Sequence, residues 1–263
     1  MLSWRLINSG PADASFNMAL DESIAQSVRS STQPPTLRIY GWIRQSVSIG
    51  AFQKISDISI EYCRAKKIPI VRRPTGGRAI LHGDELTYSF SALTEGPFSQ
   101  NLLSTYKIIG KAFFLAFQYC GLNVQMRSTR NSGENLTKNP ACFSASSLGE
   151  ICIDQIKIIG SAQKRWPGAF LQQGSIPLSI DQDIAGNVFA CGSDCCSALH
   201  GLKEWLPNLD KDTLTENILR GFREVFKADL MPDHPSDLEL ETADHLARSK
   251  YLSDEHIFRT SRP

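Results

Sequence analysis

Apolar residues recur at intervals of three and four in several stretches of the chain, a spacing that predicts amphipathic helices. In the clearest stretch Tyr106, Ile109, Phe113 and Phe117 fall on one face, and Gly121 stands where a glycine often ends a helix. The predicted helices cover residues 13–28, 61–67, 104–119, 213–226 and, more weakly, 239–251. The last dozen residues are polar, so we expect them to fray.

Shorter runs of alternating or β-branched apolar residues predict strands between these helices. The strands cover residues 2–7, 36–40, 46–50, 68–71, 86–91, 150–154, 156–159 and 169–180, the last with a break near Pro177. The chain lacks the regular alternation of strand and helix that builds a parallel sheet. The pattern therefore predicts an α+β fold with a mixed, largely antiparallel β-sheet flanked by helices. We expect a single domain over residues 1–263, with a core over about 1–200 and a helical C-terminal segment over about 205–263.

Composition narrows the class of protein. Of the 263 residues, 41% are apolar and 21% are charged, and the net charge of +1 provides no global basic field for nucleic acid or a membrane surface. No apolar run approaches the roughly 18 residues that span a bilayer, and the first residues lack a secretory signal pattern. The seven cysteines are odd in number and scattered, which disfavours a disulfide scaffold and indicates a reducing compartment, the cytoplasm.

One run concentrates candidate chemistry: Arg72-Arg73-Pro74-Thr75-Gly76-Gly77-Arg78-Ala79-Ile80-Leu81-His82. Adjacent glycines allow positive φ values and a close approach to a ligand, and successive amides in such a turn form a nest for anions. The arginines add forked donors suited to phosphate or carboxylate. An incidentally basic hairpin loop is the alternative, and the three arginines and the histidine argue against it. His82 is a general base, a donor that orients a ligand, or a hydrogen-bonded structural residue.

A second group of candidates surrounds the predicted hairpin at residues 150–159. Cys142 follows a polar loop, where a partly exposed thiol beside a cation is suited to act as a nucleophile, and Lys157 is the candidate cation. The alternative makes Cys142 a small core residue and Lys157 a solvated strand residue. Small residues at Gly160-Ser161-Ala162 allow close approach to a ligand, or mark a bulge in the sheet. Further positive charge comes from Arg127, Arg130, Lys138, Lys164 and Arg165. These side chains either steer an acidic protein partner toward the site or are ordinary surface charge.

Cys191, Cys195 and Cys196 form a cluster with His200 nearby. The group resembles part of a zinc knuckle, but its spacing matches no standard zinc site and a second pair of ligands is missing. We therefore expect no metal site.

The run from Arg72 to His82, followed by Glu85-Leu86-Thr87-Tyr88-Ser89, closely resembles the lipoate/octanoate attachment family, in the superfamily that also contains biotin–protein ligases. Further segments agree: Asn17-Met18-Ala19-Leu20-Asp21-Glu22, Tyr40-Gly41-Trp42 with Ser46-Val47-Ser48-Ile49-Gly50 and Gln53, and Lys157-Ile158-Ile159-Gly160-Ser161-Ala162-Gln163. The resemblance covers roughly residues 1–180. It implies that the single domain is a catalytic domain like that of the biotin/lipoate–protein ligases.

The family contains two chemistries. ATP-dependent lipoate ligases activate the free acid as an acyl-adenylate, whereas octanoyltransferases take the acyl chain from acyl carrier protein through a cysteine thioester. Ala141-Cys142-Phe143 resembles the nucleophile segment of the octanoyltransferases, and Gly76-Gly77-Arg78 resembles the same branch. Three features depart from the family pattern: Gly83 between His82 and Asp84, the turn Asp154-Gln155 without a glycine, and the cysteine cluster.

The resemblance implies that Cys142 takes an octanoyl group from octanoyl-acyl carrier protein and passes it to a lysine of a lipoyl domain, such as glycine-cleavage H protein. Lys157 is then expected to help ionise Cys142 and to stabilise the oxyanion. Substrate binding is expected from Arg72, Arg73, Thr75, Gly76, Gly77, Arg78, His82, Gly160, Ser161 and Ala162. No cofactor is expected, because the conversion of a thioester to an amide is downhill.

Three other functions stay open from the sequence. The first is an ATP-dependent lipoate–protein ligase, which needs ATP and Mg²⁺. The second is octanoyl transfer between lipoyl domains. The third is a non-catalytic protein that binds an acyl group or a lipoyl domain, and the intact Lys157 and Cys142 motifs weigh against it.

Overall fold

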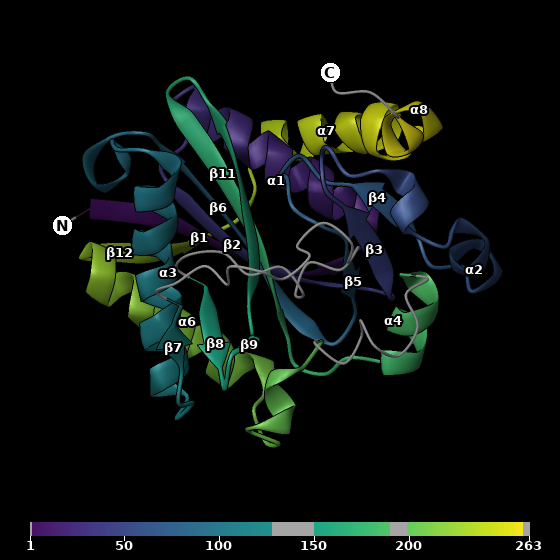
Figure 1. Cartoon of the computed structure of the whole chain (residues 1–263). Coiled ribbons are helices and arrows are strands. Elements are labelled where there is room, and N and C mark those ends of the chain that lie inside the picture. The colour runs from purple at the N-terminus through teal and green to yellow at the C-terminus, as the bar shows by residue number, and fades with distance from the viewer. Residues whose placement is uncertain (1, 128–149, 190–198, 260–263) are drawn as a thin grey trace.

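The computed structural model describes residues 2–127, 150–189 and 199–259, which form three β-sheets with helices around them (Figure 1). The largest sheet has six strands, in the order β10 (Gly160–Trp166), β11 (Ala169–Pro177), β6 (Glu85–Leu93), β2 (Thr36–Trp42), β1 (Leu2–Ala12) and β12 (Ala228–Asp233). β1 is parallel to both β2 and β12, whereas the β2–β6, β6–β11 and β11–β10 pairs are antiparallel. The predicted α+β fold with a mixed, largely antiparallel sheet is thereby confirmed.

Helices lie on both faces of this sheet. The helices of the described residues, some of which pack on the smaller sheets, are α1 (Ala14–Arg29), α2 (Ile60–Ala65), α3 (Leu102–Tyr119), α4 (Gln182–Val188), α6 (Lys211–Phe226), α7 (Asp237–Leu246) and α8 (Asp254–Phe258). Shorter turns are η1 (Ile55–Asp57), η2 (Gly96–Phe98), η4 (Leu202–Glu204) and the π-helical η5 (Ala247–Tyr251). The helices predicted from apolar periodicity are confirmed, although α7 passes into η5 before the predicted end. None of the helices in the described ranges is long and apolar enough to cross a membrane.

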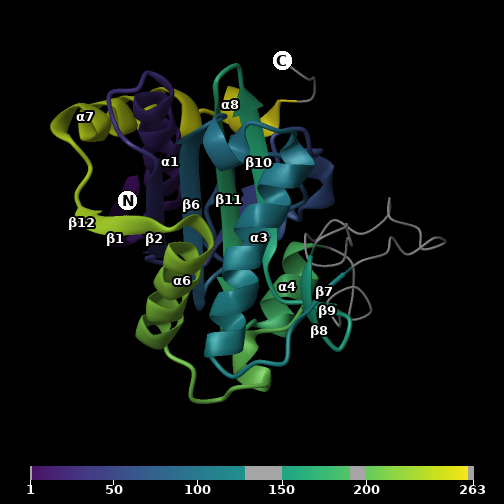
Figure 2. The same cartoon turned by 90° about the vertical axis from the view of Figure 1, so that its left-hand side faces the viewer.

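Packing of α3 and α6 creates the larger core. The two helices lie side by side over one face of the six-stranded sheet (Figure 2) and bury the aromatic rings of Phe90, Phe113 and Phe222. Gly221 permits this approach, because a Cβ there would lie 2.2 Å from the carbonyl oxygen of Ala112. On the other face, α1 packs against α7 and η5 around a second core.

Two three-stranded sheets complete the fold. Their strands are β4 (Ile70–Arg72), β3 (Ser46–Ile49) and β5 (Ile80–His82) in one, and β7 (Gln125–Met126), β8 (Ile151–Ile153) and β9 (Ile156–Lys157) in the other. β8 and β9 form the hairpin predicted around Lys157. β5 and β10 were not predicted as strands. β5 has only three residues, and β10 begins with the small residues Gly160, Ser161 and Ala162. Both become strands through pairing with a neighbouring strand and not through their own composition.

Two predictions for the C-terminal segment, that it is helical and that its end frays, need correction. The segment is not only helical, because β12 pairs in parallel with β1 and sets Leu230 opposite Trp4. The chain also does not fray after Leu252 within the described residues. α8 is held to the body of the protein by Arg72, whose guanidinium donates to the carbonyl oxygen of Ile257 at 2.7 Å. Both contacts join residues far apart in sequence, so a local pattern carries no sign of them.

Candidate active site

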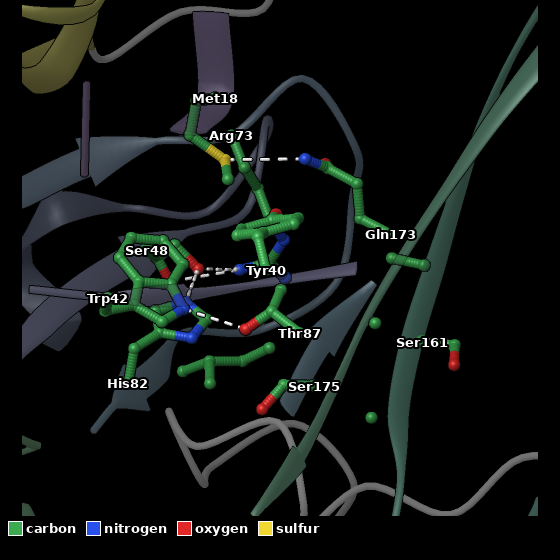
Figure 3. Close-up of a pocket in the computed structure, with 14 residues that line it drawn as sticks. Met18, Tyr40, Trp42, Ser48, Arg73, His82, Thr87, Ser161, Gln173 and Ser175 are labelled. Carbon is green, nitrogen blue, oxygen red and sulfur yellow. Dashed lines mark hydrogen bonds between the residues drawn. The ribbon is translucent and has the colours of Figure 1, made fainter. Parts of the chain in front are cut away.

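A pocket opens between the six-stranded sheet and the β3–β4–β5 sheet (Figure 3). The space between its lining residues amounts to about 330 Å³, part of which is open to solvent. Its walls come from both sheets, from α1 and from the loop after β4. The lining residues are Met18, Tyr40, Trp42, Ser48, Arg73, Ile80, His82, Thr87, Gly160, Ser161, Ala162, Gln173, Gly174 and Ser175. Aromatic and small residues with a few polar groups suit one slender, largely apolar ligand.

Arg73 holds the glycine-rich loop that forms one wall of this pocket. Its guanidinium donates to the carbonyl oxygen of Gly76 at 2.7 Å and to that of Arg78 at 2.7 Å. The same group donates to the carbonyl oxygen of Ser48 on β3 at 3.0 Å. A buried guanidinium with several carbonyl partners leaves the loop little freedom. The wall is therefore fixed before any ligand binds.

Two glycines let the loop follow this path. Gly77 has a φ of +86°, a conformation that residues with a Cβ rarely adopt. At Gly50 a Cβ would lie only 1.9 Å from the carbonyl oxygen of Gly77, so glycine is required where β3 ends against the loop. The loop is also joined to β11, because the hydroxyl of Thr75 donates to Gln173 at 2.8 Å.

Gln173, which accepts the hydrogen bond from Thr75, also donates to Asp21 on α1. Asp21 is fully buried and accepts hydrogen bonds from the side chains of Arg38, Tyr40, Ser89 and Gln173, at 2.6 to 2.8 Å. Gln173 therefore spans from Asp21 to Thr75 and ties α1, β11 and the glycine-rich loop together.

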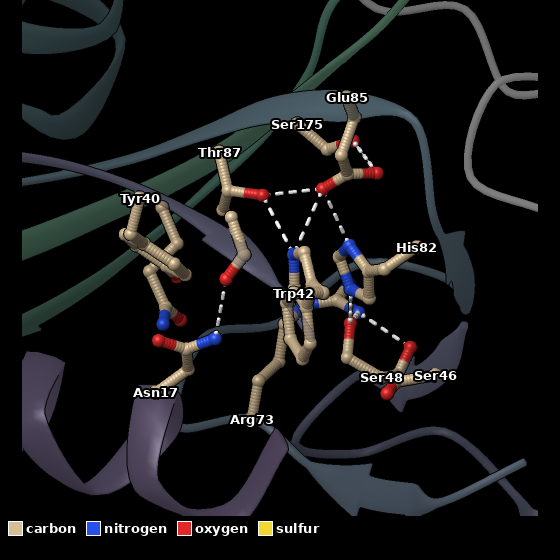
Figure 4. Close-up of polar contacts among 12 residues, drawn as sticks. Asn17, Tyr40, Trp42, Ser46, Ser48, Arg73, His82, Glu85, Thr87 and Ser175 are labelled. Atoms are coloured by element: carbon tan, nitrogen blue, oxygen red, sulfur yellow. Dashed lines mark hydrogen bonds and ion pairs between the residues drawn. The ribbon is translucent and has the colours of Figure 1, made fainter. Parts of the chain in front are cut away.

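Glu85 lies beyond the pocket wall, at the centre of a second polar network (Figure 4). Its carboxylate accepts hydrogen bonds from Trp42, His82, Thr87 and Ser175. The Nδ1 atom of His82 lies 2.7 Å from Glu85, and its Nε2 atom lies 2.8 Å from the hydroxyl of Ser48. Because a carboxylate only accepts, His82 donates to Glu85 from Nδ1. The His82 ring also stacks on Trp42, with the ring centroids 3.8 Å apart.

This network keeps Glu85 ionised. Burial alone would raise the pKa of the carboxyl, but the charge of His82 and the hydrogen bonds from His82, Thr87 and Ser175 outweigh it and hold the pKa below its ordinary value. His82 is hydrogen-bonded at both ring nitrogens, which is the structural role considered from the sequence. Its ring also forms part of the pocket wall.

The residues predicted to bind substrate divide into three groups. Those that line the pocket are Arg73, His82, Gly160, Ser161 and Ala162. Those that belong to the glycine-rich loop but not to the described lining are Thr75, Gly76, Gly77 and Arg78. Arg72 forms the third group by itself.

Arg72 is turned away from the pocket. Its guanidinium donates to the backbone carbonyls of Gly50 and Gln53, both at 2.8 Å, and of His256 and Ile257. In return the ring of His256 donates to the carbonyl oxygen of Arg72. Burial lowers the pKa of this guanidinium to about 10, and the nearby charge of Arg259 acts in the same direction. Arg72 is therefore a structural residue in this conformation rather than the substrate-binding residue expected from the sequence.

Lys157 lies on β9, just before the β10 segment that lines the pocket. The hairpin that carries it turns at Asp154 and Gln155, whose φ values of +47° and +69° supply the two positive angles of a tight turn without a glycine. The Lys157 ammonium is buried and pairs with the carboxylate of Glu150 at 2.6 Å. The expected placement of the cation on a hairpin is confirmed, and the structure pairs it with a carboxylate.

Cys142 lies outside the described residues, as do Arg130, Lys138 and the cluster Cys191, Cys195 and Cys196. Within the described ranges the free cysteines are Cys63, Cys120 and Cys152. Burial raises the pKa of all three thiols, to about 11 for Cys63. These three thiols are therefore poorly suited to act as nucleophiles at neutral pH.

No metal centre is found among the residues that the structure describes, since no group of three or more His, Cys, Asp or Glu side chains converges there. His200, the possible fourth member of the cysteine cluster, lies 2.6 Å from the carboxylate of Glu204.

Sequence reasoning missed Glu150 and Gln173. Glu150 could have been predicted from the hairpin. A two-residue turn sets Cys152 opposite Lys157. Residue 150 is on the same face as residue 152 and is therefore a diagonal neighbour of Lys157. Gln173 could not have been predicted, since its partners Asp21 and Thr75 come from distant segments.

Solved structures define the class to which this fold belongs. A lipoate–protein ligase A bound with ATP superimposes with a TM-score of 0.84 over 99% of this chain and 100% of that chain, at 22% identity. A bipartite lipoate protein ligase from Thermoplasma acidophilum gives a TM-score of 0.83 over 100% of this chain and 99% of that one, also at 22% identity. The fold is that of the lipoate–protein ligases.

Sequence comparison identifies the family. The model of the lipoyl protein ligase A/B catalytic domain matches residues 13–223. Octanoyltransferase LipM of Anoxybacillus flavithermus is 34% identical over 97% of this chain and 98% of its own length, and LipM of Bacillus subtilis is 34% identical over 98% of each. The chain belongs to the lipoyl protein ligase A/B catalytic domain family. With relatives of this similarity over nearly their whole length, it is an enzyme of the acyltransferase type, and the resemblance drawn from its motifs is confirmed.

Proposed function

We propose that the protein moves an octanoyl group from octanoyl-acyl carrier protein, through a thioester on Cys142, to a lysine of a lipoyl domain such as glycine-cleavage H protein. The observation that carries the proposal is the 34% identity to octanoyltransferases over nearly the full length of both chains. The site agrees with it, because a preformed pocket begins at Gly160, three residues after Lys157.

The reaction has two balanced steps. In the first, the Cys142 thiolate attacks the carbonyl carbon of the donor thioester, the bond from that carbon to the phosphopantetheine sulfur breaks, and the departing thiol takes up the proton that Cys142 lost. In the second, the acceptor lysine amine attacks the same carbon, a C–N bond forms, the bond to the Cys142 sulfur breaks, and the amine proton returns to Cys142. In both steps the Lys157 ammonium stabilises the negative charge that develops on the carbonyl oxygen.

The pocket is proposed to bind the octanoyl chain. Trp42 and Ile80 supply apolar wall, and each methylene that they bury contributes about 0.8 kcal/mol. Because the reaction converts a thioester to an amide, it needs neither ATP nor Mg²⁺. We place it in the cytoplasm, where free thiols such as those of Cys63 and Cys152 stay reduced.

The fold alone is compatible with a different donor, since a solved neighbour of this fold is a lipoate–protein ligase with ATP bound. A ligase of this kind would use free acid and ATP and would not need Cys142. Octanoyl transfer between lipoyl domains would use Cys142 with a different thioester or amide donor. The donor therefore has to be tested directly.

The test is intact-mass spectrometry of the full-length protein after incubation with octanoyl-acyl carrier protein and no ATP. We expect a mass gain of one octanoyl group that is lost in Cys142→Ala and kept in Cys63→Ala, a control that removes a buried thiol on α2. Addition of a lipoyl domain should then discharge the adduct. Modification of a lipoyl domain that requires ATP and survives Cys142→Ala would overturn the proposal in favour of the ligase.

A further inference from the structure

Glu150 forms a buried ion pair with Lys157 that the sequence did not predict. The two side chains are 4% and 7% exposed, and the Nζ atom of Lys157 donates to Oε1 of Glu150 at 2.6 Å. A lysine side chain has four rotatable bonds, so a buried carboxylate at this distance selects one position for its ammonium.

The backbone around Glu150 is fixed as well. Its carbonyl oxygen accepts a hydrogen bond from the amide of Arg127 at 2.8 Å, which continues the β7–β8 pairing. On the other side, β8 pairs with β9 so that Cys152 lies opposite Lys157. The carboxylate and the ammonium are thus presented by neighbouring strands of one small sheet.

The second oxygen of Glu150 points to a role beyond stability. Oε2 is buried and has no hydrogen-bond partner among the residues that the structure describes. A buried ion pair contributes little net stability, and an unpartnered carboxylate oxygen makes it less favourable still. Two apolar side chains would fill the same space at a lower cost in free energy. The pair is better explained by what it does for Lys157.

Glu150 lies beside β10, the strand that borders the acyl pocket. It lines a second space of about 240 Å³, part of it open to solvent, together with Tyr88, Phe113, Ser161 and Gln172, among others. Ser161 borders the first pocket too, but the two spaces lie on opposite faces of the sheet, because Tyr88 and Gln172 alternate along their strands with Thr87 and Gln173. Polar contacts hold β10 at this place: Tyr88 lies within hydrogen-bond distance of Ser161 at 2.8 Å and accepts a bond from Gln172 at 2.9 Å.

We propose that Glu150 is a positioning residue for the acyl transfer: its carboxylate holds the Lys157 ammonium in one place, just before the strand that borders the acyl pocket, from which it stabilises the thioester carbonyl. This inference rests on the proposed function, because it needs an acyl group in the first pocket. Glu150 does not touch the acyl group and acts through Lys157. Its unused oxygen lets the ammonium shift toward a developing oxyanion while it keeps a counter-charge.

The test separates rate from binding. Single-turnover acylation of the full-length protein, followed by intact mass at increasing octanoyl-acyl carrier protein, gives a maximal rate and a half-saturating concentration. For Glu150→Ala we expect the maximal rate to fall about 10- to 100-fold, because a misplaced group costs rate, while half-saturation changes by less than about threefold. Glu150→Gln keeps an oxygen acceptor for Lys157 and should recover part of the lost rate.

A double-mutant cycle distinguishes positioning from a separate effect. If Glu150 acts through Lys157, Glu150→Ala added to Lys157→Ala should lower the rate by no more than about twofold further. A matched control is Glu239→Ala, which breaks another buried ion pair, with Arg5 at 2.6 Å, on the α7 side of the sheet. This control should lower the melting temperature and leave the acylation rate of the folded protein near that of the wild type.

Two results would overturn the inference. One is a Glu150→Ala rate within about twofold of the wild type, and the other is a set of single-variant losses that multiply in the double variant. A wild-type protein that takes up no octanoyl group would instead refute the proposed function, and the role of Glu150 with it. The first two outcomes leave the proposed function intact, so the failures are distinguishable.

Discussion

The glycine-rich loop and the lysine hairpin are built in opposite ways. The loop is held by many independent contacts: the guanidinium of Arg73 binds carbonyl oxygens on both sides of it, Thr75 bonds to Gln173, and Gly50 packs against its backbone. The hairpin belongs to a sheet whose strands have only two or three residues. Its charged side chain, Lys157, forms an ion pair with the carboxylate of Glu150.

This difference in construction indicates that the loop serves acyl binding and the hairpin serves the chemical step. A wall with redundant contacts is rigid and can offer the same shape to every acyl chain, which keeps the entropic cost of binding low. The Lys157 ammonium, carried by a strand of two residues, is the group that meets charge as it develops on a substrate oxygen. We therefore expect changes in the hairpin to alter rate and changes in the loop or its supports to alter stability and binding.

The largest expected effect comes from the hairpin side. Lys157→Ala should reduce the rate of acylation about 10³-fold, because it removes the cation that stabilises the oxyanion. Binding of octanoate, followed by fluorescence of Trp42 in the pocket wall, should change by less than about threefold. Lys107→Ala, which removes an exposed lysine on α3, is the matched control. A parallel loss of octanoate binding would show that the two regions are not separate in function.

The second largest effect is expected for Glu85, beside the pocket wall, and is a change in stability that depends on pH. Glu85→Gln replaces an acceptor of four donors with an amide that presents its own N–H groups to them, so we expect the free energy of unfolding at pH 7 to fall by about 3 kcal/mol. Urea unfolding of the wild type and the variant measures this difference. Glu241→Gln, at an exposed position on α7, serves as the control.

The pH dependence follows from the direction of the Glu85 pKa. That pKa is lowered from an ordinary value of 4.5, so the stability contributed by the carboxylate is complete above about pH 4.5 and is lost as the pH falls through the folded-state pKa. The gap between wild type and Glu85→Gln should be constant near neutral pH and should shrink on acidification below pH 4.5. A gap that stays constant down to pH 3 would mean that Glu85 acts by shape and not by charge.

The two regions also differ in how far the sequence predicts them. The motif from Arg72 to His82 indicated the loop, and the strand pattern placed Lys157 on a hairpin, because both signals are local. The separate roles of Arg72 and Arg73 were not predictable, since adjacent arginines look alike until the carbonyls of α8 and of Gly76 are in place. Gln173 and β12 were missed for the same reason: their partners lie far away in the chain.

The smallest of the three effects is expected for Gly50→Ala, a change that tests whether the pocket wall is rigid. In Gly50→Ala the added Cβ would lie 1.9 Å from the carbonyl oxygen of Gly77, and that atom belongs to backbone that cannot rotate away. The loop must shift, so we expect unfolding free energy to fall by about 1–3 kcal/mol, as in other overpacked sites, together with weaker octanoate binding. Gly41→Ala is the control, because its nearest neighbour, Pro11, is at an ordinary 3.7 Å. Urea unfolding and octanoate titration of both variants make the comparison. If Gly50→Ala binds octanoate as the wild type does while its acylation slows, the loop contributes to chemistry after all, and the division between a rigid binding wall and a responsive lysine hairpin does not hold.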